Sequence, residues 1–239
     1  MSCIFSHQAD GPLRGAVVFL ALLALALPGQ SGPVEAPKSH SPRLANTVHV
    51  ADFASEKPAP TVRQMANWVL SSGDHAGMPF VIVDKRQARV FVFHPNGVLS
   101  GATPALMGSA TGDDSVPGIG DRQMSAILPH ERTTPAGRFL SSPGVNMSGE
   151  DIVWVDYDAA VSMHRVRTNN KKERRLERLA SATPDDNRIS FGCINLPAAF
   201  YDKVVKPALG SSPGVVYVLP ETRSLQSVFG LTVPESRSQ

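Results

Sequence analysis

The chain has 239 residues, of which 42% are hydrophobic, and its formal net charge is +2. This length fits one domain with terminal extensions, and the hydrophobic fraction is too high for a disordered chain. The nearly balanced charge gives no reason to expect a nucleic acid or an anionic membrane surface as the partner.

Residues 1–30 have the pattern of an export signal. Arg14 supplies a positive flank, and residues 16–27 are an uncharged apolar run of 12 residues, followed by small residues such as Gly29. Such a run is short for a bilayer core of about 30 Å and typical of a signal peptide. The alternative is an uncleaved anchor, and only in that case do we expect membrane contact, through this segment. Residues 31–60, rich in Pro, Ser and Ala, predict a linker.

Residues 61–75 predict an N-terminal helix. Met65 and Val69 lie at helical spacing on one face, and Thr61 with Gln64 forms a capping-box pattern. Because no chemistry-bearing residue lies in this pattern, we expect the helix to contribute packing.

Residues 76–222 predict one mostly β domain, followed by a polar tail at 223–239. The segments rich in β-branched and aromatic residues predict strands at 80–83, 89–93, 98–107, 137–140, 152–157, 161–164 and 214–219. The remaining patterns predict helices at about 171–181 and 197–208. Residues 108–137 form a long Gly- and Pro-rich loop, and loops of this length usually form a wall or lid of a functional site.

Cysteine usage draws attention to one residue. Of the two cysteines, Cys3 lies in the predicted signal, so the exported chain keeps Cys193 and forms no internal disulfide. A lone thiol in an oxidising compartment is a liability unless it is buried or used. The alternative is a cysteine that only packs in the core.

The surroundings of Cys193 favour chemistry. Gly192 precedes it, and we expect a helix to begin just after it, with Asn195 as a possible cap. Backbone N–H groups at such a turn hold negative charge, and the positive end of a helix lowers a thiol pKa. Since only the thiolate attacks, a base is needed at neutral pH. Among seven histidines, His164 is the best candidate, because it ends a β-branched segment.

Residues 190–195, Ser-Phe-Gly-Cys-Ile-Asn, with His164 upstream, resemble the active-site signature of the L,D-transpeptidase (YkuD-type) family. That signature is an upstream His followed by Ser/Thr-His-Gly-Cys-hydrophobic-Asn. Residues 134–139, Thr-Pro-Ala-Gly-Arg-Phe, resemble the family's Thr-Pro-x-Gly-x-Phe segment, and residues 81–93 resemble its opening strand pair. The resemblance covers roughly residues 79–221. It implies a mostly β (α+β), sandwich or barrel-like catalytic domain with a few short helices.

The resemblance also implies the roles of the site residues. Cys193 would be the nucleophile and His164 the general base, with its ring oriented by a neighbouring backbone carbonyl, here that of Arg165. Backbone N–H groups around Phe191, Gly192 and Cys193 would form the oxyanion hole. Ser190 is expected to steady the turn, and the expected substrate-binding residues are Phe191, Asn195, Arg165 and Arg188.

The implied partners are peptidoglycan stem peptides, and the implied location is the periplasm or envelope of a bacterium. The donor stem would be attacked at the carbonyl of its third residue, with release of the terminal D-Ala. An amine of a second stem would then give a 3→3 cross-link, whereas water would give a carboxypeptidase. We expect no cofactor, nucleotide or metal, because the sequence has no phosphate-binding Gly-rich loop before a helix and no tetrahedral ligand set.

Two departures from the family pattern leave alternatives open. Phe191 stands where the family usually has His, and a phenyl ring exchanges no proton, so we expect altered substrate contacts or rate; a catalytically impaired, peptidoglycan-binding homologue is the alternative. Residues 165–188 insert a basic segment with eight Arg or Lys and four Asp or Glu, a charge of +4. This segment is either a lid that meets substrate carboxylates or a solvated helix and loop. A cysteine hydrolase of some other exported acyl substrate is a third hypothesis.

Overall fold

The computed structural model describes residues 50–231, all of which belong to one compact unit. The predicted signal, most of the predicted linker and the end of the predicted tail lie outside these residues. The strands are β1 (Phe80–Asp84), β2 (Arg89–Phe93), β3 (Leu99–Pro104), β4 (Met107–Gly108), β5 (Gly137–Val145), β6 (Asp151–Asp156), β7 (Val161–Arg165), β8 (Arg188–Ser190), β9 (Ile194–Leu196) and β10 (Gly214–Val218). The α-helices are α1 (Pro60–Ser72), α2 (Arg175–Ala180), α3 (Ala198–Phe200), α4 (Lys206–Leu209) and α5 (Leu225–Phe229).

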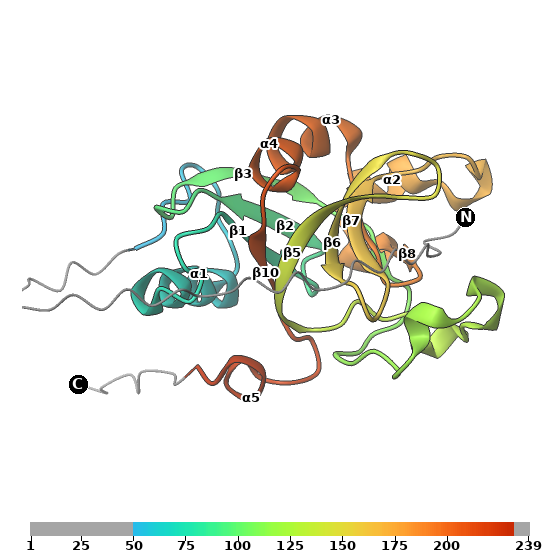
Figure 1. The fold of residues 1–239 in the computed structure, drawn as a ribbon, viewed down its shortest axis with the longest axis horizontal. Coiled ribbons are helices and arrows are strands. Elements are labelled where there is room, and N and C mark those ends of the chain that lie inside the picture. Colours follow the sequence, from blue (N-terminus) through green and yellow to red (C-terminus); the bar gives the residue numbers. More distant parts are fainter. Residues whose placement is uncertain (1–49, 232–239) are drawn as a thin grey trace, which may run out of the picture. The chain divides into compact units, whose positions relative to one another are not determined.

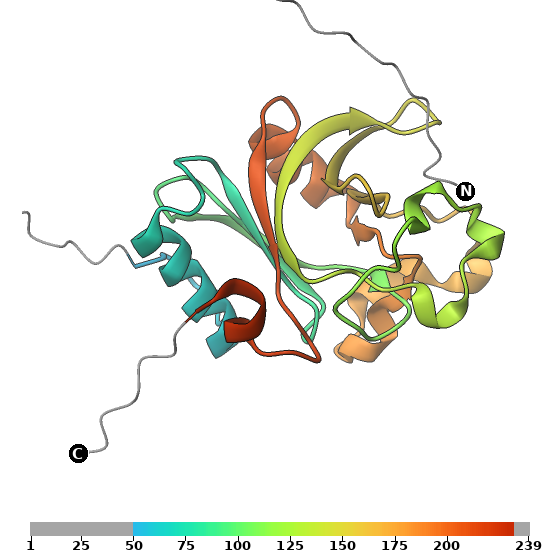
Figure 2. The ribbon, with the colours of Figure 1, turned by 60° about the horizontal axis from the view of Figure 1, so that its bottom comes forward.

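One sheet organises the domain (Figure 1). Its strand order is β3-β2-β1-β10-β5-β6-β7-β9, with β1–β10 and β7–β9 parallel and the other neighbours antiparallel. A bridge between Leu106 and Asn195 connects the chain beyond β3 to β9, the strand at the far edge. The sheet is therefore nearly closed, and Figure 2 shows how strongly β5 bends. The mostly β, barrel-like prediction is confirmed.

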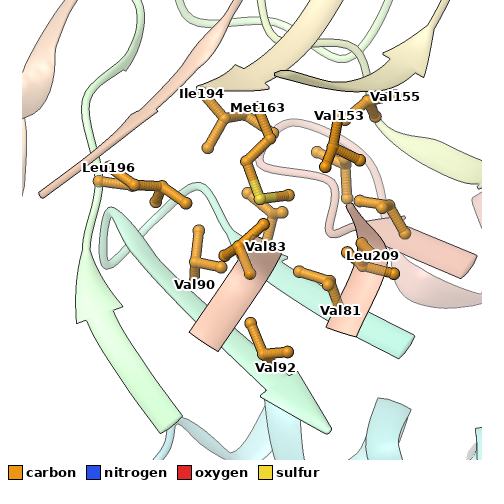
Figure 3. Close-up of a cluster of buried hydrophobic side chains, with 14 of the residues drawn as sticks. Val81, Val83, Val90, Val92, Val153, Val155, Met163, Ile194, Leu196 and Leu209 are labelled. Carbon is orange, nitrogen blue, oxygen red and sulfur yellow. The ribbon is translucent and has the colours of Figure 1, made fainter. Parts of the chain in front are cut away.

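Both faces of the central strands are buried, which explains their continuous apolar sequence. Val81 and Val83 of β1 lie in one hydrophobic cluster (Figure 3), and the alternate residues Phe80 and Ile82 lie in a second cluster against α1. Successive side chains of a strand point to opposite faces, so each residue of β1 reaches a core. Each such side chain stabilises the fold by about 1.5–3 kcal/mol relative to exposure.

Helix α1 confirms the predicted helix but begins differently. Pro60 is its first residue and Ala59 its N-cap, with no side-chain capping bond, so Thr61 lies inside the first turn and the capping-box prediction is wrong. Proline favours the first helical position because its φ is already helical and it has no N–H to satisfy. The buried face includes Met65 and Val69, as the spacing predicted.

Two segments predicted as linker and tail pack onto the domain instead. Phe53 is buried, and its ring centroid lies 5.3 Å from that of Phe93. Beyond residue 222, α5 forms, and Phe229 lies 6.3 Å from the ring of Tyr217. Both segments are polar overall, so their sequence pattern did not predict that these few apolar side chains pack onto the domain.

The segments around the turn that carries Cys193 also differ from the prediction. Residues 194–196 form β9, so no helix begins directly after Cys193; helical residues start at Ala198, with Pro197 as the N-cap, and continue through a π-helix at Tyr201–Val205 into α4. The long loop at 108–137 contains the 3-10 turns η1 (Ile119–Asp121), η2 (Met124–Ala126) and η3 (Pro129–Glu131). Within residues 50–231, no helix combines the length and apolar character needed to cross a membrane.

Candidate active site

The turn that carries Cys193 lies between β8 and β9 and is held by hydroxyl groups. Ser190 Oγ donates to the Cys193 carbonyl oxygen at 2.6 Å and accepts from the Gly192 N–H at 3.1 Å. Thr134 Oγ1 donates to the Gly192 carbonyl oxygen at 2.8 Å and accepts from the Gly108 N–H at 2.9 Å. The Thr-Pro-x-Gly segment thus has a physical role, because its threonine fixes the cysteine turn to β4.

Gly192 is required at its position on two grounds. Its φ is +129°, a conformation that L side chains rarely adopt, and an added Cβ would lie 2.7 Å from the Thr133 carbonyl oxygen. Its N–H is directed to Ser190 Oγ in this structure. The predicted oxyanion role of the Gly192 N–H is therefore not supported by this contact, whereas the roles predicted for the Phe191 and Cys193 N–H groups stay predictions.

The Cys193 side chain is half-buried and has two close neighbours on the preceding elements. Its Sγ lies 3.6 Å from the Ala160 carbonyl oxygen and 3.7 Å from Ser162 Oγ. The sequence interpretation missed Ser162. Its position two residues before His164 on one strand was the available signal, since residues i and i+2 share a face.

His164 lies on the same face of β7 as Ser162 and opposite Asn195 of β9 in the strand register. Its Nδ1 is 2.7 Å from the Arg165 carbonyl oxygen, and its Nε2 is 3.4 Å from Asn195 Nδ2. A carbonyl oxygen only accepts, so Nδ1 carries a hydrogen, and in the neutral ring the lone pair is then on Nε2. The contact with the Arg165 carbonyl is the one that the family resemblance implies.

A cavity of about 400 Å³ brings these groups together, and both His164 and Cys193 line it. One wall is formed by the long loop, with Ile119, Met124 and Ile127, and another by the inserted basic segment. The third is the cysteine turn itself. The cavity therefore joins an apolar side, a charged side and a thiol, an arrangement suited to an extended ligand with charged groups.

Phe191 faces this cavity beneath an arginine. The Arg132 guanidinium carbon lies 4.0 Å from the centre of the Phe191 ring, and Arg132 Nη2 donates to the Ile127 carbonyl oxygen at 3.1 Å. A guanidinium over a ring face is attracted to it electrostatically. Phe191 thus lines the cavity, and its predicted contact with a substrate stays a prediction.

The side chains of Arg165 and Arg188 are not brought to the cavity. Arg165 pairs with Asp151 at 3.1 Å and Asp202 at 2.6 Å. Arg188 pairs with Glu221, and its Nη2 donates to the Lys85 carbonyl oxygen at 3.0 Å. Acids in other elements hold both side chains, the half-exposed Asp151 and Asp202 for Arg165 and the buried Glu221 for Arg188, so the structure gives no support to the predicted substrate contacts, which stay predictions.

Asn195 contributes to the site differently from the prediction. It is in β9, 1% exposed, and caps no helix. Its Nδ2 donates to the Cys193 carbonyl oxygen at 3.2 Å, and its Oδ1 accepts from Arg175 Nη1 at 2.5 Å. Both ends of the amide are thus engaged within the protein, and the predicted substrate contact of Asn195, which lines the cavity, stays a prediction.

The inserted basic segment forms a wall of the cavity through Arg167, Glu173 and Arg175, among others. Both of these arginines have an acidic partner: Arg167 lies 2.5 Å from Glu150, and Arg175 lies 2.5 Å from Glu173. The segment is therefore neither a purely solvated helix nor a cluster of unpaired cations. The pattern of charges did not indicate that Arg175 in particular reaches Asn195.

No protein-family model and no curated protein matches the chain. Solved structures with a similar fold include an L,D-transpeptidase from Xylanimonas cellulosilytica DSM 15894, with 12% identity, a TM-score of 0.38 and coverage of 59% of this chain and 60% of that one. An L,D-transpeptidase from Mycobacterium smegmatis has 18% identity and a TM-score of 0.33, and the match covers 59% of this chain and 58% of that one. The helical cell shape determining protein Pgp2 from Campylobacter jejuni has 14% identity and a TM-score of 0.40, and the match covers 67% of this chain and 57% of that one.

The chain thus spans about 60% of the length of these proteins. Similarity at these identities and TM-scores carries no conclusion about activity, which has to come from the residues of the site. The structures with which the similarity is found nevertheless include members of the family that the sequence around Cys193 resembles, the L,D-transpeptidases.

Proposed function

We propose that this chain is an exported cysteine acyltransferase that acts on peptidoglycan stem peptides as an L,D-transpeptidase. The observation that carries the proposal is the placement of Cys193 and His164 on one cavity, with His164 Nδ1 bonded to the Arg165 carbonyl oxygen at 2.7 Å. That bond leaves the lone pair on Nε2, the form in which an imidazole takes a proton from a thiol. The choice of substrate rests on the resemblance of residues 190–195 to the family signature.

In the first half-reaction, His164 Nε2 accepts the thiol proton and Cys193 Sγ attacks the carbonyl carbon of the third stem residue. The tetrahedral intermediate collapses as the C–N bond to D-Ala breaks, and the imidazolium returns the proton to the leaving amine. The product is a thioester on Cys193. Ser162 Oγ, 3.7 Å from Sγ, supports the thiolate by donating a hydrogen bond.

In the second half-reaction, a stem amine attacks the thioester carbonyl and loses its proton to His164, while Cys193 leaves as the thiolate and is reprotonated. The result is a 3→3 cross-link. Water as the nucleophile gives a carboxylate instead, so an L,D-carboxypeptidase shares the site and the first step. The half-buried thiol favours neither nucleophile.

The decisive experiment is mass spectrometry of the purified chain after incubation with tetrapeptide muropeptides. We expect an acyl adduct on Cys193, with D-Ala release and 3→3 dimers, and none of these in Cys193→Ala. His164→Ala should lose nearly all turnover, whereas His94→Ala, which changes a histidine in an exposed turn, should keep it.

Three other outcomes separate the alternatives. D-Ala release without dimers identifies the carboxypeptidase. Binding of peptidoglycan without an adduct identifies an impaired homologue, with Phe191 as the reason, and an adduct with other acyl compounds only identifies a different cysteine hydrolase. Full activity of Cys193→Ala would overturn the mechanism.

A further inference from the structure

One arginine of the inserted basic segment contacts a residue that lies beside His164 and Cys193. Arg175 begins α2, its side chain is 15% exposed, and its Nη1 donates to Asn195 Oδ1 at 2.5 Å. Its Nε donates to Glu173 Oε2, also at 2.5 Å. The guanidinium is therefore fixed at two of its donors, one toward the segment itself and one toward β9.

The segment is anchored well enough to hold Arg175 in place. Arg178 Nε donates to the Glu173 carbonyl oxygen at 2.9 Å, and Arg178 Nη1 donates to the Asp186 carbonyl oxygen at 2.7 Å. Leu179 is buried, and Asn187 Nδ2 donates to the Ala105 carbonyl oxygen at 3.1 Å. These contacts connect both ends of α2 to the segment and to the domain.

Arg175, together with the Cys193 carbonyl oxygen, fixes which end of the Asn195 amide faces His164. A guanidinium has donors only, so the amide oxygen must point to Arg175 and the amide nitrogen must point away from it. The nitrogen then lies 3.4 Å from His164 Nε2 and 3.2 Å from the Cys193 carbonyl oxygen. The shorter of these contacts is a hydrogen bond and the longer one is at most a weak one, and both have the donor facing an acceptor, so the three contacts agree on one orientation.

The opposite orientation would change the state of His164. A flipped amide would place its oxygen against Nε2, while the Arg165 carbonyl oxygen lies against Nδ1 at 2.7 Å. Acceptors at both nitrogens favour the doubly protonated ring, which has no lone pair to take the thiol proton. The contact at 3.4 Å is itself weak, and its importance is that it excludes this alternative.

We propose that Arg175 is a positioning residue that holds the Asn195 amide nitrogen toward His164 and so keeps a lone pair on His164 Nε2 at neutral pH. The inference rests on the proposed function of His164 as the base. It gives the inserted segment a specific task at the site, which is to supply this one contact.

Other charged groups also face His164 and have to be separated from this effect. Glu150 comes from the β5–β6 hairpin and Arg167 from the chain beyond β7, and they pair with each other at 2.5 Å. Glu173 and Arg175 come from the inserted segment, and β9 presents the uncharged Asn195. Loss of Arg175 therefore removes a cation as well as a hydrogen bond, and the experiment has to distinguish the two.

The test follows the protonation of the His164 ring nitrogens by NMR in the full chain as a function of pH. We expect Arg175→Ala to raise the titration midpoint of His164 by about one pH unit, the size of one hydrogen bond. The midpoint of Arg175→Lys should lie between those of the wild type and Arg175→Ala, because an ammonium also donates hydrogen bonds but the lysine side chain is shorter.

A double-mutant cycle identifies the cause. In an Asn195→Ala background, Arg175→Ala should no longer move the midpoint if the effect passes through the amide, whereas a purely electrostatic effect would persist. Arg167→Ala is the matched control, since it also removes one cavity-lining cation but does not touch Asn195. An unchanged midpoint in a folded Arg175→Ala variant, or an equal shift in the double background, would overturn the inference. Because the NMR readout needs no stem peptide, failure of the proposed function would appear separately, as a wild-type chain without acyl adduct.

Discussion

Ser162 Oγ lies 3.7 Å from Cys193 Sγ, on the same face of β7 as His164. A hydroxyl at this distance donates to a thiolate more strongly than to a thiol, because hydrogen bonds to a charged acceptor are the stronger ones. The serine therefore lowers the free energy of the reactive form, although the family signature does not include it.

We expect Ser162→Ala to slow the alkylation of Cys193 by iodoacetamide at pH 7 by about fivefold, which corresponds to about 1 kcal/mol for one hydrogen bond. Ser148→Ala is a suitable control, because Ser148 lies in an exposed turn away from the thiol. An equal alkylation rate for Ser162→Ala and the wild type would exclude this role for Ser162.

Gly192→Ala should disturb the turn that presents Cys193. The backbone there has φ +129°, and the new Cβ would lie 2.7 Å from the Thr133 carbonyl oxygen, so strain of about 1–3 kcal/mol comes with a steric clash. We expect a lower thermal midpoint and a loss of acylation. Gly118→Ala separates the two causes, because Gly118 has φ +71° and nothing within 4 Å of an added Cβ. If both variants lost the same stability, the clash with Thr133 would be unimportant.

The strands of the sheet, and the lining of one cavity by both Cys193 and His164, were predictable because their signals are local. The continuous apolar runs at 80–83 and 90–93 are those of strands buried on both faces, and the motif around Cys193 is contiguous. The confirmed strands β1, β2, β6 and β7 all have such runs.

The remaining features depend on contacts that no local pattern encodes. Asn195 was expected near a helix start, but the parallel pairing of β9 with β7 and the bridge to Leu106 make it a strand residue. Arg175 is one cation of eight in its segment, and only the packing of α2 places it at Asn195. Arg188 looked like a ligand contact because its acid, Glu221, lies 33 residues away in the chain.

Lys85 holds the long loop and should be important for stability. Its ammonium is fully buried and donates to Asp113 Oδ1 at 2.8 Å, to the Thr134 carbonyl oxygen at 2.9 Å and to the Gly112 carbonyl oxygen at 2.5 Å. Lys85→Met would leave these acceptors buried without their donor, so we expect a loss of about 3–5 kcal/mol in the free energy of unfolding.

Urea unfolding measures this loss, with Lys203→Met as the control, because Lys203 is exposed on the π-helix. Acylation by Lys85→Met should also decline before global unfolding, since Thr134 connects this ammonium to the Gly192 carbonyl oxygen. A loss below about 1 kcal/mol would show that water enters and replaces the ammonium.

Asp113 should make stability depend on acidic pH. Burial raises the pKa of the Asp113 carboxyl, but hydrogen bonds from Lys85, Thr222 and the N–H groups of Glu221 and Arg223 outweigh burial and hold the pKa well below its ordinary value. A carboxyl with a lowered folded pKa stabilises the fold above its unfolded pKa, and this contribution is lost as pH falls toward the folded value. The stability should therefore decline from about pH 4 downward.

The slope of unfolding free energy against pH between 5 and 2 tests this expectation. Asp113→Asn should be less stable at pH 7 and should show a shallower decline, because the variant has no carboxylate to protonate. Asp114→Asn should keep the wild-type slope, since the Asp114 side chain is 79% exposed. Equal slopes for the wild type and Asp113→Asn would assign the acid sensitivity to other carboxyls.

Phe191 occupies the position where the family signature has His, and its ring lies beneath the Arg132 guanidinium at 4.0 Å. Phe191 lines the same cavity as Cys193, so we expect it to contact the ligand rather than to change the reactivity of the thiol. Phe191→Ala should accordingly lower kcat/KM for stem peptides about tenfold, through lost contacts and a released Arg132, while Cys193 alkylation stays unchanged. Phe191→His should keep or raise turnover, because an imidazole still packs under Arg132 and adds a hydrogen-bonding group to the cavity. If Phe191→His lowered alkylation as well as kcat/KM, Phe191 would be acting on the thiol itself, and its role as part of the ligand wall would be wrong.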